Sequence, residues 1–298
     1  MTDEQTFEGE PDALPVLPSS IRAAVVSELS SFESFVEGLG VEDTAKPSTI
    51  KGWSNLDVIA HVQLALSLYT RVLAAAASGW TGGAVGKAVG SVTKTVLPAA
   101  APAINAINSM LPHVMTGTLE PEAVQGQLVG SSRSLRARLE KLQSVDYTKP
   151  IYYRGAPWPV SFFMAAMLNE IAIHRWDIES TLVGDAHLSD AARSVLPWFY
   201  WSGTSIMFRP PAGTAGTVAM ALVDPTTDLS WVIDAGGTIS TLRGIEPNTD
   251  ATIRGENGTV ILALAGRISP EDAVRTTSVT VEGDEVLGNR FLSSWKIL

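Results

Sequence analysis

The sequence predicts a mainly α domain over residues 15–208 and a smaller α+β domain over residues 209–298. Three observations lead to this prediction. Apolar residues recur at helical spacing in long segments up to about residue 208. From about residue 214, short runs rich in Val, Ile and Thr stand between Gly and Asp clusters, which is typical of strands. Hydrophobic residues make up 45% of the chain, enough to bury a sizeable core.

The composition excludes several classes of function. The formal net charge is −10, so the surface should repel phosphates, and we expect no nucleic-acid partner. The chain has no cysteine, which excludes disulfides and a cysteine nucleophile and fits a cytoplasmic protein. Any thiol chemistry must therefore use a thiol that a ligand supplies. Residues 1–14 are acidic and lack an apolar signal segment, so we expect them to form a disordered leader.

Four long helices are expected in the first domain, and a fifth should follow them. The second helix begins with an N-cap signal, Ser54 with Asp57 three residues later, and is so apolar that it should be buried. Pro197 could kink the fifth helix. The expected helices span residues 18–40, 53–77, 120–143, 161–184 and 188–208.

The second domain should begin after a linker at residues 209–216. Alternating segments predict its strands, and the apolar run NGTVILALAG at 257–266 predicts a helix. The segment SVTVEGDEV at 278–286 predicts a strand with a hairpin. The other predicted strands lie in the segments TAGTVAMALVD, DLSWVIDAGG, TISTLRG and DATIRG.

Three polar residues stand in apolar surroundings: between Phe162 and Ile173 only Asn169 and Glu170 are neither apolar nor small, and the helix that contains His61 is almost wholly apolar. Glu170 and His174 lie one turn apart on the same face of the fourth long helix, and His61 lies inside the second. A buried carboxylate is costly unless it is paired or binds a cation. One carboxylate with two imidazoles would fit a catalytic Zn²⁺ or a non-haem Fe(II) with open coordination positions. The alternative is that these residues are hydrogen-bonded core groups.

Two aspartates could orient the imidazoles, because Asp57 and Asp177 each lie about one turn from a histidine. For Asp57 we favour the simpler interpretation that it caps its helix. Asp177 could equally be solvated or pair with Arg175. The remaining histidines, His113 and His187, stand beside turn residues, and we expect both to be solvated.

Two segments resemble the mycothiol-dependent maleylpyruvate isomerase family. GWSNLDVIAHV at 52–62 is similar to the His-bearing helix start of the DinB-like superfamily, and NEIAIHRWDIE at 169–179 is similar to the family's Glu-x-x-x-His segment. The resemblance implies a four-helix bundle that holds a metal ion through His61, Glu170 and His174. It also implies a sterol-carrier-like C-terminal domain, which ATIRGENGTVILALAGRISPEDA and VTVEGDEVLGNRF resemble. The resemblance covers residues 18–77, 120–208 and 214–298.

Residues 79–113 depart from the family pattern, because helix connections in a bundle are usually short. This segment is apolar and Gly-rich, and Pro98, Pro102 and Pro112 interrupt it, so we expect an inserted helical hairpin and no membrane span. It could wall a pocket for a large apolar substrate or bind a partner. Alternatively, it could merely extend the core.

The resemblance implies a metal-dependent enzyme that activates a low-molecular-weight thiol, mycothiol, for addition to an electrophilic small molecule. The outcome would be isomerisation or S-transfer. The expected metal is Zn²⁺, with Fe or Ni as alternatives. The second hypothesis is a non-enzymatic binding protein for a lipid-like or other apolar ligand, with a structural metal. Arginines that could meet an anionic substrate are Arg154, Arg175, Arg243, Arg254 and Arg267.

Overall fold

The computed structural model describes residues 16–77, 110–153, 156–223, 226–235, 238–276 and 279–295. The predicted leader at 1–14 and Arg154 lie outside the described residues. So does most of the predicted insertion at 79–113, of which only residues 110–113 are described, and these begin a short helical segment that runs from 110 to 116.

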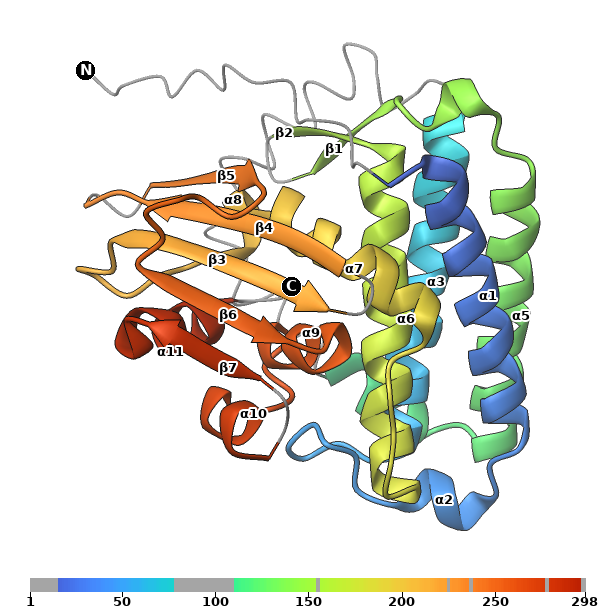
Figure 1. The fold of residues 1–298 in the computed structure, drawn as a ribbon. Coiled ribbons are helices and arrows are strands. Elements are labelled where there is room, and N and C mark those ends of the chain that lie inside the picture. The colour runs from blue at the N-terminus through green and yellow to red at the C-terminus, as the bar shows by residue number, and fades with distance from the viewer. Residues whose placement is uncertain are drawn as a thin grey trace, which may run out of the picture.

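Four long helices form the bundle that the sequence predicts (Figure 1). They are α1 (Pro18–Glu37), α3 (Asn55–Ala77), α5 (Pro121–Glu140) and α6 (Val160–Leu182). Each packs against two others, in the order α1, α5, α3, α6 and back to α1. The mainly α fold of the first part of the chain is therefore confirmed, and α3 and α6 are neighbours in it.

Helix α1 shows why the apolar spacing predicted the bundle. Its buried side chains recur every three or four residues, which places them on one face of the helix. That face points into the core, and burying a large aliphatic side chain contributes roughly 1.5–3 kcal/mol. The buried apolar residues of α1 are Ile21, Ala24, Val25, Leu29, Phe32 and Val36.

The expectation that α3 is buried all round is only half right. Its first turns are buried, but Leu68 keeps 59% of its surface exposed. The reason is geometric: α5 and α6 cover two sides of α3, and a stripe through Leu68 faces neither of them. Among the residues that the structure describes, α3 is the one helix long and apolar enough to cross a membrane by length and composition.

The start of α3 is fixed by the capping signal that the sequence contains. The Ser54 backbone N–H and hydroxyl donate to Asp57 Oδ2 at 2.8 and 2.7 Å, and the Asp57 N–H donates to Ser54 Oγ at 3.2 Å. This reciprocal arrangement satisfies N–H groups that a helix start would otherwise leave unpaired.

Replacing the cap should therefore lower stability without changing the fold. We expect Ser54→Ala to reduce the free energy of unfolding by about 1 kcal/mol, because Asp57 N–H loses its acceptor. Urea unfolding followed by circular dichroism measures the change. Ser134→Ala is a matched control, since Ser134 is an exposed residue within α5 that donates only to the Gly130 carbonyl. An equal loss in both variants would contradict the capping role.

The segment between the bundle and the sheet differs in detail from the prediction. The fifth helix passes through Pro197 and is interrupted six residues later, so that it is divided into α7 (Asp190–Ser202) and α8 (Thr204–Met207). The division falls at Gly203, where a Cβ atom would lie 3.0 Å from the Phe199 carbonyl oxygen and 2.4 Å from Met207 Cε. A short hairpin, β1 (Pro150–Tyr153) and β2 (Ala156–Pro159), precedes α6 and was not predicted.

A five-stranded sheet forms the second part of the chain, in the order β5-β4-β3-β6-β7. Its neighbours are antiparallel except for β3 and β6, which are parallel. The strands are β3 (Gly216–Val223), β4 (Thr226–Ile233), β5 (Ile239–Arg243), β6 (Ala251–Gly255) and β7 (Thr280–Gly283). Three helices accompany them: α9 (Asn257–Leu264), α10 (Pro270–Thr276) and α11 (Glu285–Ser293). The predicted α+β character is thus confirmed.

The predicted hairpin at 278–286 is wrong. After β7 the chain turns at Gly283, whose φ of 84° favours glycine, and enters α11. Asp284 caps this helix by accepting a hydrogen bond from Leu287 N–H at 2.9 Å. A capping aspartate after glycine resembles a hairpin turn in sequence, and the two cannot be told apart without the apolar face of α11, Leu287, Phe291 and Leu292.

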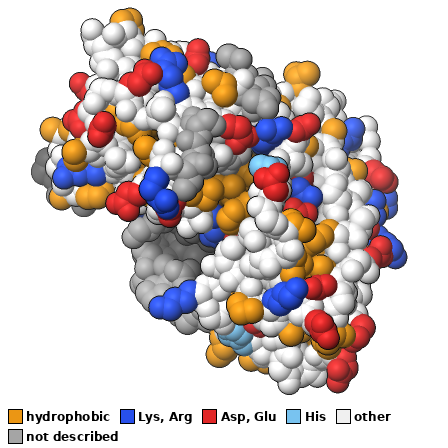
Figure 2. Space-filling view, turned by 60° about the horizontal axis from the view of Figure 1, so that its bottom comes forward, with side chains coloured by type: hydrophobic (Ala, Val, Ile, Leu, Met, Phe, Trp, Pro, Cys, Tyr) orange, Lys and Arg blue, Asp and Glu red, His pale blue; other side chains and the backbone are white. Residues whose placement is uncertain are grey.

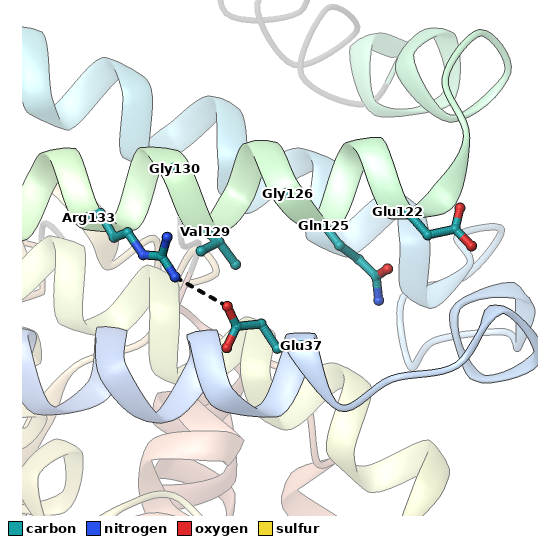
Figure 3. Close-up of a pocket in the computed structure, with 7 residues that line it drawn as sticks. All are labelled: Glu37, Glu122, Gln125, Gly126, Val129, Gly130 and Arg133. Carbon is teal, nitrogen blue, oxygen red and sulfur yellow. Dashed lines mark hydrogen bonds and ion pairs between the residues drawn. The ribbon is translucent and has the colours of Figure 1, made fainter.

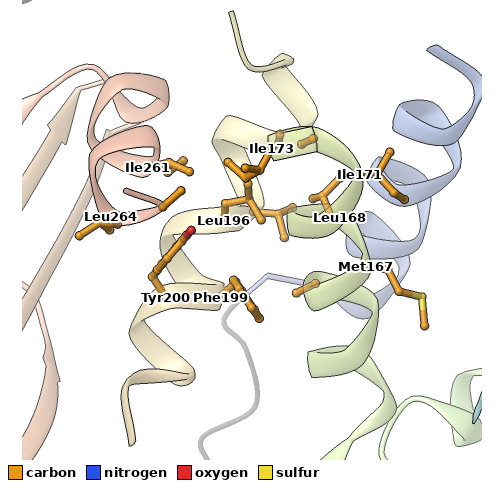
Figure 4. Close-up of a cluster of buried hydrophobic side chains, with 14 of the residues drawn as sticks. Met167, Leu168, Ile171, Ile173, Leu196, Phe199, Tyr200, Ile261 and Leu264 are labelled. Atoms are coloured by element: carbon orange, nitrogen blue, oxygen red, sulfur yellow. The ribbon is translucent and has the colours of Figure 1, made fainter. Parts of the chain in front are cut away.

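The hydrophobic core continues from the bundle into the second part. Figure 4 shows side chains of α6, α7 and α9 meeting in one cluster, with Leu196 and Tyr200 of α7 between Ile173 of α6 and Ile261 of α9. Trp231 of β4, which is fully buried, donates to Thr204 Oγ1 at 2.8 Å across the same junction. The sheet part is therefore packed firmly against the bundle.

Candidate metal centre

The structure brings the three predicted ligand residues together at the packing interface of α3 and α6. His61 Nε2 lies 2.8 Å from Glu170 Oε1, and His174 Nε2 lies 3.5 Å from the same oxygen. One potential ligand atom from each residue lies within 4.8 Å of the others. Within the described part of the chain this is the one group of three or more such residues that meets this criterion.

The helices explain the convergence. Glu170 and His174 share one face of α6, one turn apart, and α3 packs along that face with His61 directed toward it. The rings of His61 and His174 meet edge to face with centroids 4.9 Å apart. The ring of Trp53 also meets His61 edge to face, with centroids 5.4 Å apart. The His61 side chain is 23% exposed, which is about twice the exposure of Glu170 and His174.

Glu170 is an ion in this environment. Burial alone would raise the pKa of Glu170, but the positive charge of His174 and the nearby His61 imidazole outweigh it and hold the pKa well below its usual range. Yet Glu170 Oε1 has no properly directed hydrogen bond in the described structure, although His61 Nε2 is close. A buried carboxylate oxygen with two imidazole nitrogens and no directed hydrogen bond is a donor set that suits a divalent cation.

Asp177 orients His174, as one of the sequence interpretations predicts. His174 Nδ1 lies 2.8 Å from Asp177 Oδ2, so Nδ1–H donates to the carboxylate and Nε2 faces Glu170. Burial would lower the pKa of His174, but the charge of Glu170 and the hydrogen bond with Asp177 raise it to about 9. The potential at this position therefore favours a positive charge.

Asp57 serves the helix start and not the imidazole of His61. Besides its capping bonds, it accepts from Thr116 Oγ1 at 2.7 Å and lies 3.0 Å from His113 Nδ1. His113 is exposed as expected, with 47% of its side-chain surface accessible, and it also contacts Asp57, which the sequence did not indicate. His187 pairs with Asp185 in an exposed position, in agreement with its prediction.

The candidate arginines have different surroundings from one another. Arg175 pairs with Glu28 and Glu179, Arg254 forms an exposed pair with Glu282, and the Arg243 guanidinium lies over the Trp201 ring. The alternative that Asp177 pairs with Arg175 is wrong. Its partner is Arg267, which donates from Nε to Oδ1 at 2.6 Å and from Nη2 to Oδ2 at 2.9 Å.

A groove of about 420 Å³ lies elsewhere, between α1 and α5 (Figure 3). Gly126 and Gly130 line it, and the Arg133–Glu37 ion pair closes one side at 3.3 Å. This is the side of the bundle opposite the α3–α6 pair, so the groove is separate from the three converging residues. On the face shown in Figure 2, basic side chains are scattered among acidic and uncharged ones.

Fold and site together define a helical bundle with a cluster of two histidines and one carboxylate in its core, joined to an α+β part. Residues 25–179, more than half of the chain, match the model for the mycothiol maleylpyruvate isomerase N-terminal domain. The chain belongs to this family, and the family resemblance in its sequence is confirmed.

Solved structures share the fold. The crystal structure of the mycothiol-dependent maleylpyruvate isomerase aligns with a TM-score of 0.55 and 14% sequence identity, over 90% of this chain and 93% of that chain. The structure of a histidine-to-alanine mutant of that enzyme aligns with the same values. No curated protein sequence matches the chain.

Sequence reasoning missed two residues that hold Asp177. Arg267 was only one of five candidate arginines for the substrate, and Thr49, which donates to Asp177 Oδ1 at 2.5 Å, was not singled out. Thr49 lies 128 residues from Asp177 and Arg267 lies 90 residues from it, so no local spacing could have indicated either contact.

Proposed function

We propose that this protein is a metal-dependent enzyme that activates a low-molecular-weight thiol for addition to an electrophilic small molecule. His61, Glu170 and His174 are the proposed metal ligands, with Zn²⁺ as the expected ion and Fe or Ni as alternatives. The convergence of these three side chains on one point between α3 and α6 is the observation that carries the proposal. Family membership supports mycothiol as the thiol.

The residues fit a divalent cation in number, type and orientation. Three protein ligands leave at least one coordination position for an external group, whereas structural zinc sites usually have four. The negative potential that raises the pKa of His174 to about 9 would equally stabilise a bound cation in place of a proton. The partly exposed His61 gives the site a side that a ligand can approach.

A divalent ion bound there would lower the pKa of a coordinated thiol, so that the thiolate forms at neutral pH. Other residues of the protein would support the metal ligands. Asp177 keeps Nδ1 of His174 protonated and thereby presents Nε2 to the site, while the apolar helices around Glu170 exclude water. Isomerisation and S-transfer both begin with addition of the thiolate to an electrophilic carbon, so both remain within the proposal.

The two parts of the chain have different roles in this proposal. We propose that residues 15–208 carry the metal chemistry and that residues 209–298 form a sterol-carrier-like domain that contributes to substrate binding. A cytoplasmic location accords with the dependence on a small thiol. A large apolar substrate remains part of the proposal because Leu68, on the same helix as His61, is exposed.

The second candidate function is binding of a lipid-like or other apolar ligand without catalysis, with a structural metal. It would need a fourth protein ligand, and His113 was the candidate. Its Nδ1 faces Asp57 at 3.0 Å, and it is not a member of the three-residue cluster, which favours the enzymatic proposal.

Elemental analysis and calorimetry test the proposal together. We expect the purified protein to bind about one equivalent of Zn²⁺, as a site with one ligand set requires. Mycothiol should then release heat on titration into the zinc-loaded protein and none into protein treated with a chelator. Equal mycothiol binding by both forms, or none by either, would contradict thiol activation and favour the binding-protein hypothesis.

A further inference from the structure

The loop after α9 reaches back to the bundle through one side chain, Arg267. Helix α9 ends in a turn in which Gly266 N–H donates to the Ala263 carbonyl and Arg267 N–H to the Leu262 carbonyl, at 3.0 and 2.8 Å. Gly266 adopts φ 67°, the left-handed conformation that this helix ending requires. The turn fixes the backbone of Arg267 and directs the side chain from the sheet part of the chain to α6.

Arg267 and Asp177 form a two-pronged ion pair at that junction. Both bonds, Nε to Oδ1 at 2.6 Å and Nη2 to Oδ2 at 2.9 Å, match the planar geometry in which guanidinium and carboxylate bind most strongly. The Asp177 side chain is fully buried, so its charge depends on such partners.

The same carboxylate holds the imidazole of a proposed metal ligand. Asp177 Oδ2 accepts from both His174 Nδ1 and Arg267 Nη2, and Thr49 completes the set on Oδ1. If Arg267 were absent, Asp177 would be left with one charged partner and could rotate about its terminal bond. The ring of His174 would then lose the fixed acceptor that directs Nε2 toward Glu170.

We propose that Arg267 is a positioning residue, which holds Asp177 and through it the ring of His174, so that docking of the sheet part tightens metal binding in the bundle. The inference rests on the proposed function, since it presupposes a metal site at His174. It assigns Arg267 a role distinct from contact with an anionic substrate. The chain is thereby one functional unit, in which the second part completes a site whose ligands all lie in the first.

The test measures Zn²⁺ affinity directly, by competition with a chromogenic chelator, and needs no substrate. We expect Arg267→Gln to weaken Zn²⁺ binding by about 10-fold, the lower end of the range for residues that support a metal ligand. Arg267→Lys, which keeps the charge but loses the two-pronged geometry, should fall between Arg267→Gln and the wild type. Arg267→Lys also provides the test if the Arg267→Gln variant does not fold.

Arg193→Gln is the matched control. Arg193 of α7 donates to Glu256 Oε1 at 2.9 Å, just before α9, and so also joins the two parts of the chain without contacting Asp177. We expect its Zn²⁺ affinity to equal that of the wild type. In an Asp177→Asn background, Arg267→Gln should cause no further loss, because the two residues act in series.

Three outcomes would overturn the inference: wild-type affinity in folded Arg267→Gln, equal losses in Arg267→Gln and Arg193→Gln, or additive losses with Asp177→Asn. Wild-type protein that binds no Zn²⁺ would instead refute the proposed function, so the two failures are distinguishable.

Discussion

His61→Ala and Glu170→Gln should each weaken Zn²⁺ binding by at least about 100-fold, more than is typical for loss of a supporting residue. His61→Ala removes one of the two imidazole nitrogens that face Glu170 Oε1. Glu170→Gln keeps the shape of the side chain but removes the negative charge that both imidazoles face. Elemental analysis after dialysis and chelator competition measure the loss, and mycothiol-dependent turnover should fall in parallel.

The two other histidines supply the controls. His187 pairs with exposed Asp185, so His187→Ala should bind Zn²⁺ as the wild type does. His113→Ala removes a partner of Asp57 and should also leave Zn²⁺ affinity unchanged. Full metal occupancy in both His61→Ala and Glu170→Gln would refute the site. A large loss in His113→Ala would instead indicate a closed structural site with four ligands.

Arg175→Met should lower the free energy of unfolding by about 3 kcal/mol or more, because it leaves a buried charge without its partner. Arg175 Nε lies 2.8 Å from Glu28 Oε1, and Nη1 donates to Glu179 Oε1 at 3.2 Å. The Glu28 side chain is 1% exposed, and its other oxygen accepts only from Ser189 at 2.5 Å in the described structure. Methionine replaces the aliphatic part of arginine, so the loss reports mainly the charge.

Urea unfolding in the presence of a chelator measures this effect without a contribution from bound metal. Arg254→Met is the comparison, because Arg254 pairs with Glu282 at 3.0 Å while both side chains are about half exposed. Such a surface pair should contribute less than about 1 kcal/mol. Adding Glu28→Gln to Arg175→Met should restore part of the stability. Equal losses in Arg175→Met and Arg254→Met would show that burial of the charge does not matter here.

Much of the helical part could be predicted because its signals are local. The spacing of Ile21, Val25 and Leu29 marks the buried face of α1, and Ser54 with Asp57 marks the start of α3. These features depend on residues three or four positions apart, and hydrogen bonds within the helix keep that separation whatever packs around it. The same reasoning placed Glu170 and His174 on one face of α6 before any partner was known.

Where prediction failed, neighbours distant in sequence decided the outcome. Leu68 is exposed because α5 and α6 leave one side of α3 uncovered, although its local sequence is as apolar as a core helix. The segment after β7 forms the helix α11, because in this conformation Leu287 and Phe291 pack into the hydrophobic core. The β1–β2 hairpin lies in a Pro-rich stretch whose composition predicts a loop.

For the site, the sequence by itself determined the ligand types, the one-turn spacing of Glu170 and His174, and the apolar stretch that precedes them in the helix. The apolar surroundings of His61 made it a candidate third ligand, and the family resemblance implied the same residue. Only the tertiary structure decided that α3 lies against α6, that Asp177 contacts His174, and that Arg267 of the loop after α9 binds Asp177. A helix fixes distances within a few residues through its own hydrogen bonds, whereas contacts over 90 residues exist only once the core has folded.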